Sequence, residues 1–276
     1  MGETADWILN DVYDSALKEE NVLQAFSNSE TQEEVLEGQN GGGAGMTCHM
    51  FPAGTGTSSR VVKGGKGETF TIGVIVQSNY GHTRDLLIGG VPVGKLLVKE
   101  RTPEEEAAIW NIPSGTSGKA DDGSIVVYLM WVQLDSFKIS ERYADSSSTD
   151  APLLPHQLNR VARHCAVGLA QVGGHGVGRN HSGDIILAIS TANKPNEINT
   201  APQVDGVSPV ELNQVEIIKN ESTDTMFRAA SEATEEAILN SIVAGRAGRT
   251  GNKGYKLAGF PAERVKELLK KHLVVV

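Results

Sequence analysis

Residues 121–127 read Asp-Asp-Gly-Ser-Ile-Val-Val, an acidic turn that ends at a glycine and leads into an apolar, β-branched run. This run predicts a buried strand, because β-branched residues fit a pleated and packed surface. Ser124 is then the first residue of the strand, where its hydroxyl is held rigidly while the preceding turn stays accessible. The position suits a nucleophile, which could also attack the Gly123–Ser124 peptide bond. On spacing alone, a capped turn before a strand is the simpler interpretation.

Composition narrows the class of protein. The chain has 276 residues, 39% of them hydrophobic, which is enough for one large globular domain or two small ones. Its formal net charge of −9 argues against binding to nucleic acid or to an anionic membrane. Two cysteines, Cys48 and Cys165, do not make a disulfide framework, and no apolar run approaches the length of a membrane span. We therefore expect a cytoplasmic protein from a reducing compartment.

Hydrophobic periodicity predicts both strands and helices in each half of the chain. Strands are expected at residues 47–51, 54–62, 70–77, 86–98, 125–134 and 184–189, and helices at 6–26, 158–169, 225–244 and from Pro261 onward. Short β runs combined with long helices favour a layered α+β fold, an αββα sandwich, over a regular βαβ alternation.

Several short blocks follow one another in a fixed order along the chain. They are NGGGAGM (40–46), GTGTSSR (54–60), QSNYG (77–81), GVPVG (90–94), DGSIVV (122–127), TDAPLLPHQL (149–158), SGDI (182–185) and STAN (190–193). Together these blocks resemble the DmpA/BapA family of N-terminal-serine aminopeptidases (peptidase family S58), which includes L-aminopeptidase/D-esterases and β-aminopeptidases. The resemblance runs from Glu3 to the C-terminal helix.

The resemblance implies an αββα sandwich similar to that of Ntn hydrolases and of ornithine acetyltransferases. Members of the family are cut once, autocatalytically, before the nucleophile, and the two chains stay together. Here one peptidase domain, 1–276, would become chains 1–123 and 124–276. The family removes N-terminal residues from peptides, amides and esters, and it tends to form homo-oligomers. It implies a hydrolase that needs no cofactor and takes small substrates rather than nucleic acid or membranes.

The expected chemistry centres on Ser124. Its hydroxyl would attack the Gly123 carbonyl, and Ser124 would become the N-terminal residue of the second chain. The new α-amine has an ordinary pKa of about 7.7–8.0, so it can act as the base for its own hydroxyl.

Four further residues take roles from the resemblance. Ser182 and Asp184 match the pair that supports the proton relay, although a turn serine before a strand-start acid explains them equally well on sequence alone. Asn79 stands where the family has its oxyanion stabiliser. Glu3 matches the carboxylate that receives the substrate's ammonium group, but Ala5 replaces the aromatic residue that follows in the family pattern.

The histidines suggest no metal site. They are scattered along the chain, and no pair has convincing metal-ligand spacing.

The chain also departs from the family pattern in two places. It begins where that pattern is already about one third complete, so the N-terminal strands are expected to be missing. Thr149 lies 25 positions after Ser124, and we interpret residues 135–148 as an inserted exposed loop. Two explanations compete for the whole stretch 128–148, a lid over the site or retained intron sequence. We favour the second, because the flanking blocks would join into the family pattern if most of the stretch were removed.

Two other functions remain open. One is an acyltransferase on the same fold, although such enzymes use a threonine nucleophile. The other is a catalytically inactive homologue.

Overall fold

A mixed four-stranded sheet forms the centre of the computed structural model, which describes residues 9–10, 17–31, 34–105, 124–131, 151–175, 183–193, 210, 212, 214–251 and 254–273. The strands are β3 (Thr55–Lys63), β4 (Thr69–Asn79), β5 (Ser124–Trp131) and β6 (Asp184–Ser190), in that spatial order. β3, β4 and β5 are mutually antiparallel, whereas β5 and β6 are parallel. The four strands were predicted, and β5 begins at Ser124 as expected.

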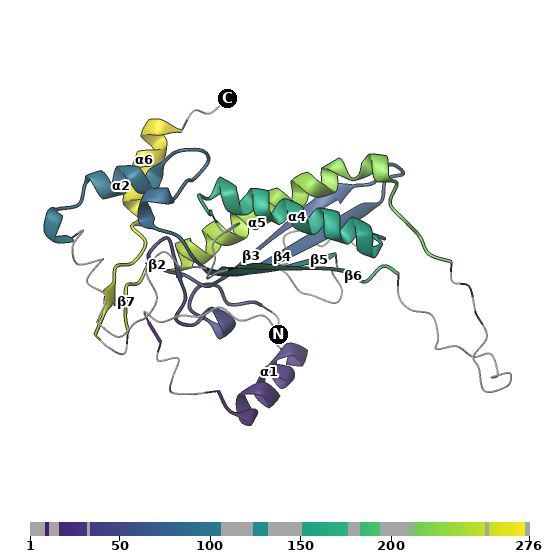
Figure 1. Ribbon diagram of the computed structural model, residues 1–276, viewed down its shortest axis with the longest axis horizontal. Coiled ribbons are helices and arrows are strands. Elements are labelled where there is room, and N and C mark those ends of the chain that lie inside the picture. Colours follow the sequence, from purple (N-terminus) through teal and green to yellow (C-terminus); the bar gives the residue numbers. More distant parts are fainter. Residues whose placement is uncertain are drawn as a thin grey trace.

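Two long helices cover one face of this sheet (Figure 1). α4 (Pro155–Gln171) lies on the connection between the parallel strands β5 and β6, and α5 (Asp224–Ala244) packs beside it. Gly56 on β3 permits this close packing, because a Cβ there would lie 1.9 Å from the carbonyl oxygen of Ala237. The helices therefore lie against the sheet through small residues as well as through apolar side chains such as Ile238.

The opposite face of the sheet is apolar and less covered along β6. On β6, Ile186 and Ala188 pack against the core, while the alternate residues Ile185, Leu187 and Ile189 are 48%, 50% and 39% exposed. The apolar run at 185–189, which follows Asp184, predicted a buried strand. Among the residues that the structure describes, one of its faces is partly buried and the other is exposed.

Smaller elements gather near the end of the sheet where β4 finishes. A hairpin is formed by β1 (Thr47–Cys48) and β2 (Phe51–Pro52). The prediction of one strand over 47–51 was therefore wrong. The chain reverses at His49 and Met50, which have φ of 49° and 63°, and no glycine in the sequence indicated such a turn.

The prediction of β structure over 86–98 was also wrong. Residues Val93–Lys99 form the helix α2, and only Ile88 and Val91 make an isolated β-bridge. Gly94 lies so close to the Thr83 carbonyl that a Cβ would be 1.7 Å from its oxygen. This contact packs the helix onto the 3₁₀ turn η2 (Thr83–Asp85), an interaction that short-range periodicity does not reveal.

The remaining elements lie towards the two ends of the chain. α6 (Ala262–His272) follows Pro261 and buries Val265 and Leu268, as predicted. The N-terminal helix α1 covers Glu19–Thr31, so it overlaps the predicted helix 6–26 over residues 19–26, and its apolar residues are exposed. Residues 9–10 and 17–18 are not helical, and the other residues before Glu19 lie outside the described part of the chain. The other short elements are η1 (Gly41–Gly43), η5 (Asn220–Ser222), β7 (Arg249–Thr250) and β8 (Lys256–Leu257). None of the helices within the described ranges is long and apolar enough to span a bilayer.

Candidate active site

Three of the predicted site residues meet at one end of the sheet, where strands β4, β5 and β6 end or begin. Asn79, the last residue of β4, is the register partner of Ser124, the first residue of β5. Asp184, the first residue of β6, is the register partner of Ile125. Glu3, Gly123, Ser182 and the loop 135–148 lie outside the described residues. Residues that lie 45 and 60 positions apart in sequence are thus brought onto neighbouring strand ends.

Ser124 is held by the strand that follows it. The three residues that follow it are each 1% exposed: Ile125, Val126 and Val127. The start of β5 is therefore held by packing on both faces of the sheet. Ser124 itself is partly exposed. A hydroxyl at such a position has a fixed backbone and remains accessible, which a nucleophile requires.

Asn79 is buried, and the orientation of its amide follows from one hydrogen bond. The backbone N–H of Thr47 donates to Oδ1 of Asn79 over 3.1 Å. Because an N–H can only donate, the amide oxygen faces Thr47 and the NH₂ group faces away from it. The side chain therefore directs donors, rather than an acceptor, away from the hairpin, and this is the polarity that an oxyanion needs.

Asp184 lies against the backbone of the nucleophile strand. The side chain is about half buried, and burial raises its pKa above the ordinary value, although a hydrogen bond from the Ile125 N–H acts in the opposite direction. Alternation along the paired strands places Asp184 on the face of Ile125, and Ser124 on the face of Val126. The carboxylate is thus positioned near the backbone nitrogens at the start of β5.

A buried group that the sequence reasoning missed lies next to Asn79. Tyr80 is 7% exposed, and burial raises its pKa well above the ordinary value, with contributions from Cys48 and from the charge of Asp184. Burial also raises the pKa of the Cys48 thiol to about 12. Both groups therefore stay protonated at neutral pH and add no charge beneath the site. Nothing in the sequence around Cys48 predicted that this thiol would be buried beneath the site.

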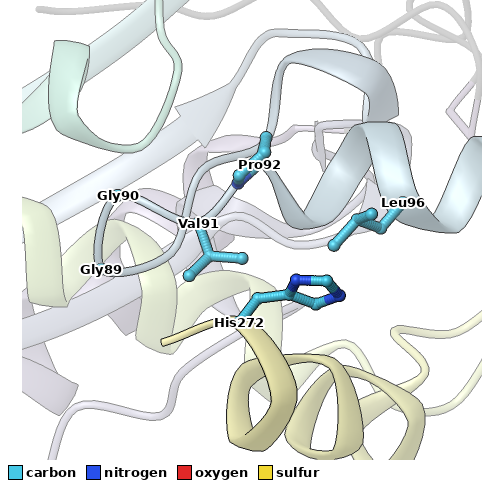
Figure 2. Close-up of a pocket in the computed structure, with 6 residues that line it drawn as sticks. All are labelled: Gly89, Gly90, Val91, Pro92, Leu96 and His272. Atoms are coloured by element: carbon cyan, nitrogen blue, oxygen red, sulfur yellow. The ribbon is translucent and has the colours of Figure 1, made fainter. Parts of the chain in front are cut away.

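A separate pocket of about 370 Å³ opens between the turn at Gly89–Gly90 and the end of α6. Figure 2 shows Val91, Leu96 and His272 around it. Of the predicted site residues that the structure describes, Asn79, Ser124 and Asp184, none lines this pocket. It therefore adds no group to the catalytic arrangement.

A metal site would need several clustered ligands. Within the described ranges, no group of three or more His, Cys, Asp or Glu side chains is arranged to hold a metal ion.

The fold and the strand-end arrangement agree with one family of hydrolases. Residues 1–256 match the sequence profile of peptidase family S58, and the chain belongs to this family. The beta-peptidyl aminopeptidase BapA of Sphingosinicella microcystinivorans is 36% identical over 272 residues, which are 99% of this chain and 61% of that protein. The BapA of Sphingosinicella xenopeptidilytica is 34% identical over 276 residues, covering 98% of this chain and 59% of that protein.

Solved structures show the same fold. The L-aminopeptidase D-Ala-esterase/amidase of Ochrobactrum anthropi, described as a variant of the Ntn hydrolase fold, superposes with a TM-score of 0.68 at 32% identity. That match covers 95% of this chain and 60% of the other. A beta-aminopeptidase of Burkholderia sp. gives a TM-score of 0.69 at 30% identity, with 98% and 63% covered. The α+β fold of the Ntn hydrolase type is therefore confirmed, and the chain spans about three fifths of the length of these relatives.

Proposed function

We propose that this chain acts as a self-processing serine aminopeptidase that releases N-terminal residues from peptides, amides or esters. The observation that carries the proposal is the meeting of Asn79, Ser124 and Asp184 at one end of the sheet. The profile of a peptidase family over most of the chain supports it. The proposal includes a cytoplasmic protein that assembles into homo-oligomers.

The first step would be processing. Oγ of Ser124 attacks the carbonyl carbon of Gly123, the C–N bond breaks, and the chain passes through an ester between Gly123 and Ser124. Water then hydrolyses the ester, which leaves a carboxylate on Gly123 and a free α-amine on Ser124. Residues 1–123 and 124–276 become separate chains.

Turnover would use the new amine. It accepts the proton of Oγ while Oγ attacks the scissile carbonyl, and the NH₂ group of Asn79 donates to the oxygen that becomes negative. The leaving amine takes the proton, and water hydrolyses the ester that remains on Ser124. Asp184, beside the backbone at the start of β5, favours the protonated amine by its negative charge. Ser182 would complete the relay, and Glu3 would bind the substrate's ammonium group.

Denaturing electrophoresis with intact mass measurement tests the nucleophile. The wild-type protein should give two fragments whose masses correspond to cleavage between Gly123 and Ser124. It should also release p-nitroaniline from an aminoacyl p-nitroanilide. Ser124→Ala should remain one chain and release none. Ser59→Ala is the matched control, because Ser59 pairs with Gly73 in the middle of β3, away from the strand ends.

Two outcomes would count against the proposal. Cleavage of Ser124→Ala at the same bond would remove Ser124 as the nucleophile. A wild-type protein that stays intact and hydrolyses nothing would support an inactive homologue. Transfer of the acyl group to an added amine in preference to water would instead favour an acyltransferase.

A further inference from the structure

The turn between β1 and β2 has an unusual backbone. His49 and Met50 have φ of 49° and 63°, and among the described residues they are the two non-glycine residues with positive φ. A two-residue turn with both φ positive is the type I′ hairpin geometry, in which glycine or asparagine is normally preferred. A histidine persists in such a conformation only when its surroundings determine it strongly.

His49 is fixed by three hydrogen bonds. Its N–H donates to the carbonyl of Tyr80 over 2.7 Å, and its own carbonyl accepts from Oγ1 of Thr83 over 3.0 Å. Its ring atom Nδ1 lies 2.9 Å from the carbonyl oxygen of His82. A carbonyl can only accept, so Nδ1 carries the hydrogen and donates. Burial lowers the pKa of His49 to about 4, so at neutral pH the imidazole is a neutral ring with its hydrogen on Nδ1, and the residue is 0% exposed.

The space around the ring is equally specific. The His49 and Tyr80 rings meet edge to face with centroids 5.2 Å apart. A Cβ on Gly81 would lie 2.9 Å from two atoms of the His49 ring, and Gly81 has φ of +85°. Only glycine fits there, so the segment after Asn79 is shaped to receive the histidine.

The hairpin in turn holds Asn79. The N–H of Thr47, two residues before His49, donates to Oδ1 of Asn79. Cys48 forms a parallel bridge with Tyr80. The same hairpin thus contacts the side chain of Asn79 and the backbone of the residue after it. Both contacts help to orient the Asn79 amide.

We propose that His49 is a positioning residue for the Asn79 amide in the reaction described above. By docking the turn onto Tyr80, Thr83 and His82, it places the Thr47 N–H, and that donor fixes the amide with its NH₂ group towards the start of β5. The inference rests on the proposed function, in which Asn79 stabilises the oxyanion. Without His49, the hairpin constrains the orientation of the amide less strongly.

Kinetics in two backgrounds test this role. His49→Ala should lower kcat about tenfold and change KM by less than about twofold, because the oxyanion contact is made only in the transition state. In the Asn79→Ala background, His49→Ala should cause no further loss. His49→Asn should restore part of the rate, since asparagine tolerates positive φ and carries a donor. His164→Ala on α4 is the control histidine and should leave kcat unchanged.

An equal loss of kcat in both backgrounds would overturn the proposal, because a general loss of folded protein lowers both alike. A second readout does not depend on activity. In ¹H–¹⁵N spectra, the side-chain NH₂ pair that disappears in Asn79→Ala should shift or broaden in His49→Ala and stay in place in His164→Ala. If the wild-type protein is inactive but the NH₂ pair responds, the proposed function fails and the positioning stands. If the pair does not respond to His49→Ala, the positioning fails, whatever the activity.

Discussion

Both faces of β6 and of the adjoining part of β5 are apolar, yet the described residues cover them very differently at the β6 side of the sheet. On the face beneath α4 and α5, Leu129 is fully buried. On the other face, Leu187 is 50% exposed, although it lies on the neighbouring strand. Strands with apolar residues on both faces are typical of sheets that are buried on both sides. The comparison indicates that β6 has the sequence of a strand from the middle of a layered sandwich.

The largest effect that we expect comes from a matched pair of leucine substitutions. Leu129→Ala should lower the free energy of unfolding by about 2–5 kcal/mol, because it removes a buried side chain and leaves a cavity. Leu187→Ala should cost about 1 kcal/mol or less, in proportion to its partial burial. Urea unfolding of both variants measures the difference. Equal losses would mean that Leu187 is covered in the folded protein, which would break the contrast between the faces.

The site itself is divided between the two faces, and this allows a sharper test. At this end of the sheet, Asn79 and Ser124 lie on one face and Asp184 lies on the other. Asn79→Ala should lower kcat on an aminoacyl p-nitroanilide by about 10²–10³-fold, or about 2.7–4 kcal/mol, if the amide donates to the oxyanion. Asp184→Asn should slow both processing and hydrolysis while the fold stays intact. Wild-type rates for both variants would remove these residues from the mechanism.

The sequence predicted the framework well, for identifiable reasons. β4, α4 and α5 have long apolar patterns, and such patterns predict the elements reliably because they determine which side is buried. Ser124, Asn79 and Asp184 were correctly expected at strand ends. Their proximity came from the resemblance to a family, since periodicity contains no information about which strands are neighbours.

The elements that were missed depend on contacts between distant residues. The helix α2 forms where Gly94 packs on Thr83, and the hairpin turn is held by the carbonyls of Tyr80 and His82. The group of Thr47 that donates to Asn79 is a backbone N–H, so the identity of the side chain at position 47 does not predict this hydrogen bond. Interactions of this kind are determined by the tertiary structure and not by local sequence.

A pH-dependent effect of intermediate size is expected at the buried end of the sheet. Burial lowers the pKa of His49 to about 4, whereas in the unfolded chain it is about 6.5. Above pH 6.5 both states are neutral and the stabilising effect is complete. As the pH falls from 6.5 to 4 the unfolded chain takes up the proton first, so roughly 3 kcal/mol of stability is lost.

This contribution can be isolated by substitution. The free energy of unfolding should fall less steeply between pH 6.5 and pH 4 in His49→Gln than in the wild type, as measured by urea unfolding at several pH values. Parallel curves for the two proteins would show that His49 is not a buried neutral group.

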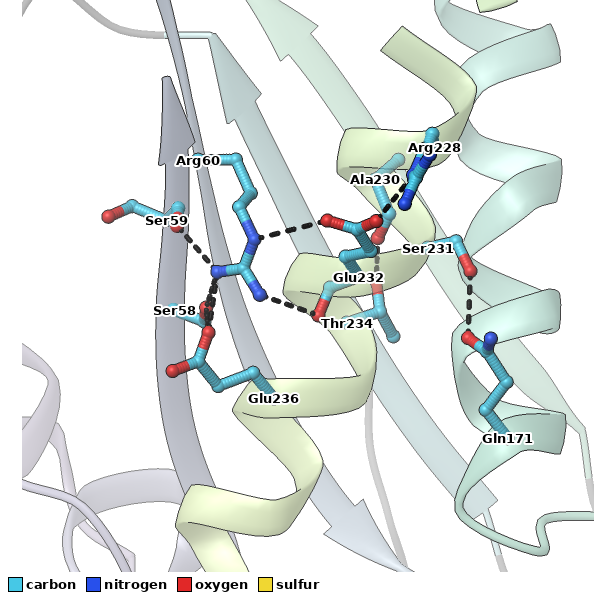
Figure 3. A network of polar contacts seen from close by, with 10 residues as sticks. All are labelled: Ser58, Ser59, Arg60, Gln171, Arg228, Ala230, Ser231, Glu232, Thr234 and Glu236. Atoms are coloured by element: carbon cyan, nitrogen blue, oxygen red, sulfur yellow. Dashed lines mark hydrogen bonds and ion pairs between the residues drawn. The ribbon is translucent and has the colours of Figure 1, made fainter. Parts of the chain in front are cut away.

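The smallest effect is expected from the polar network on the helix-covered face (Figure 3). Arg60 on β3 reaches α5, with Nη1 2.5 Å from Glu236 and Nε 3.6 Å from Glu232. Burial acts to raise the pKa of Glu236, but hydrogen bonds from Arg60 and Ser58 hold it below the usual value. These side chains are 31–48% exposed, so water and salt screen most of the attraction.

The contribution of Arg60 to the free energy of unfolding therefore depends on its screened ion pairs and on the packing of its apolar stem. Arg60→Met keeps the apolar stem of the side chain and removes the charge, so it should cost less than about 1 kcal/mol of stability in urea unfolding. The loss should shrink in 1 M salt, where the screening length is about 3 Å. Arg228→Met is the matched control, since Arg228 is 82% exposed and pairs with the same Glu232. It should change stability by only about 0.2–0.5 kcal/mol. A loss above about 2 kcal/mol for Arg60→Met that persists in high salt would show that the ion pairs, rather than the apolar contacts of α5, attach this helix to the sheet.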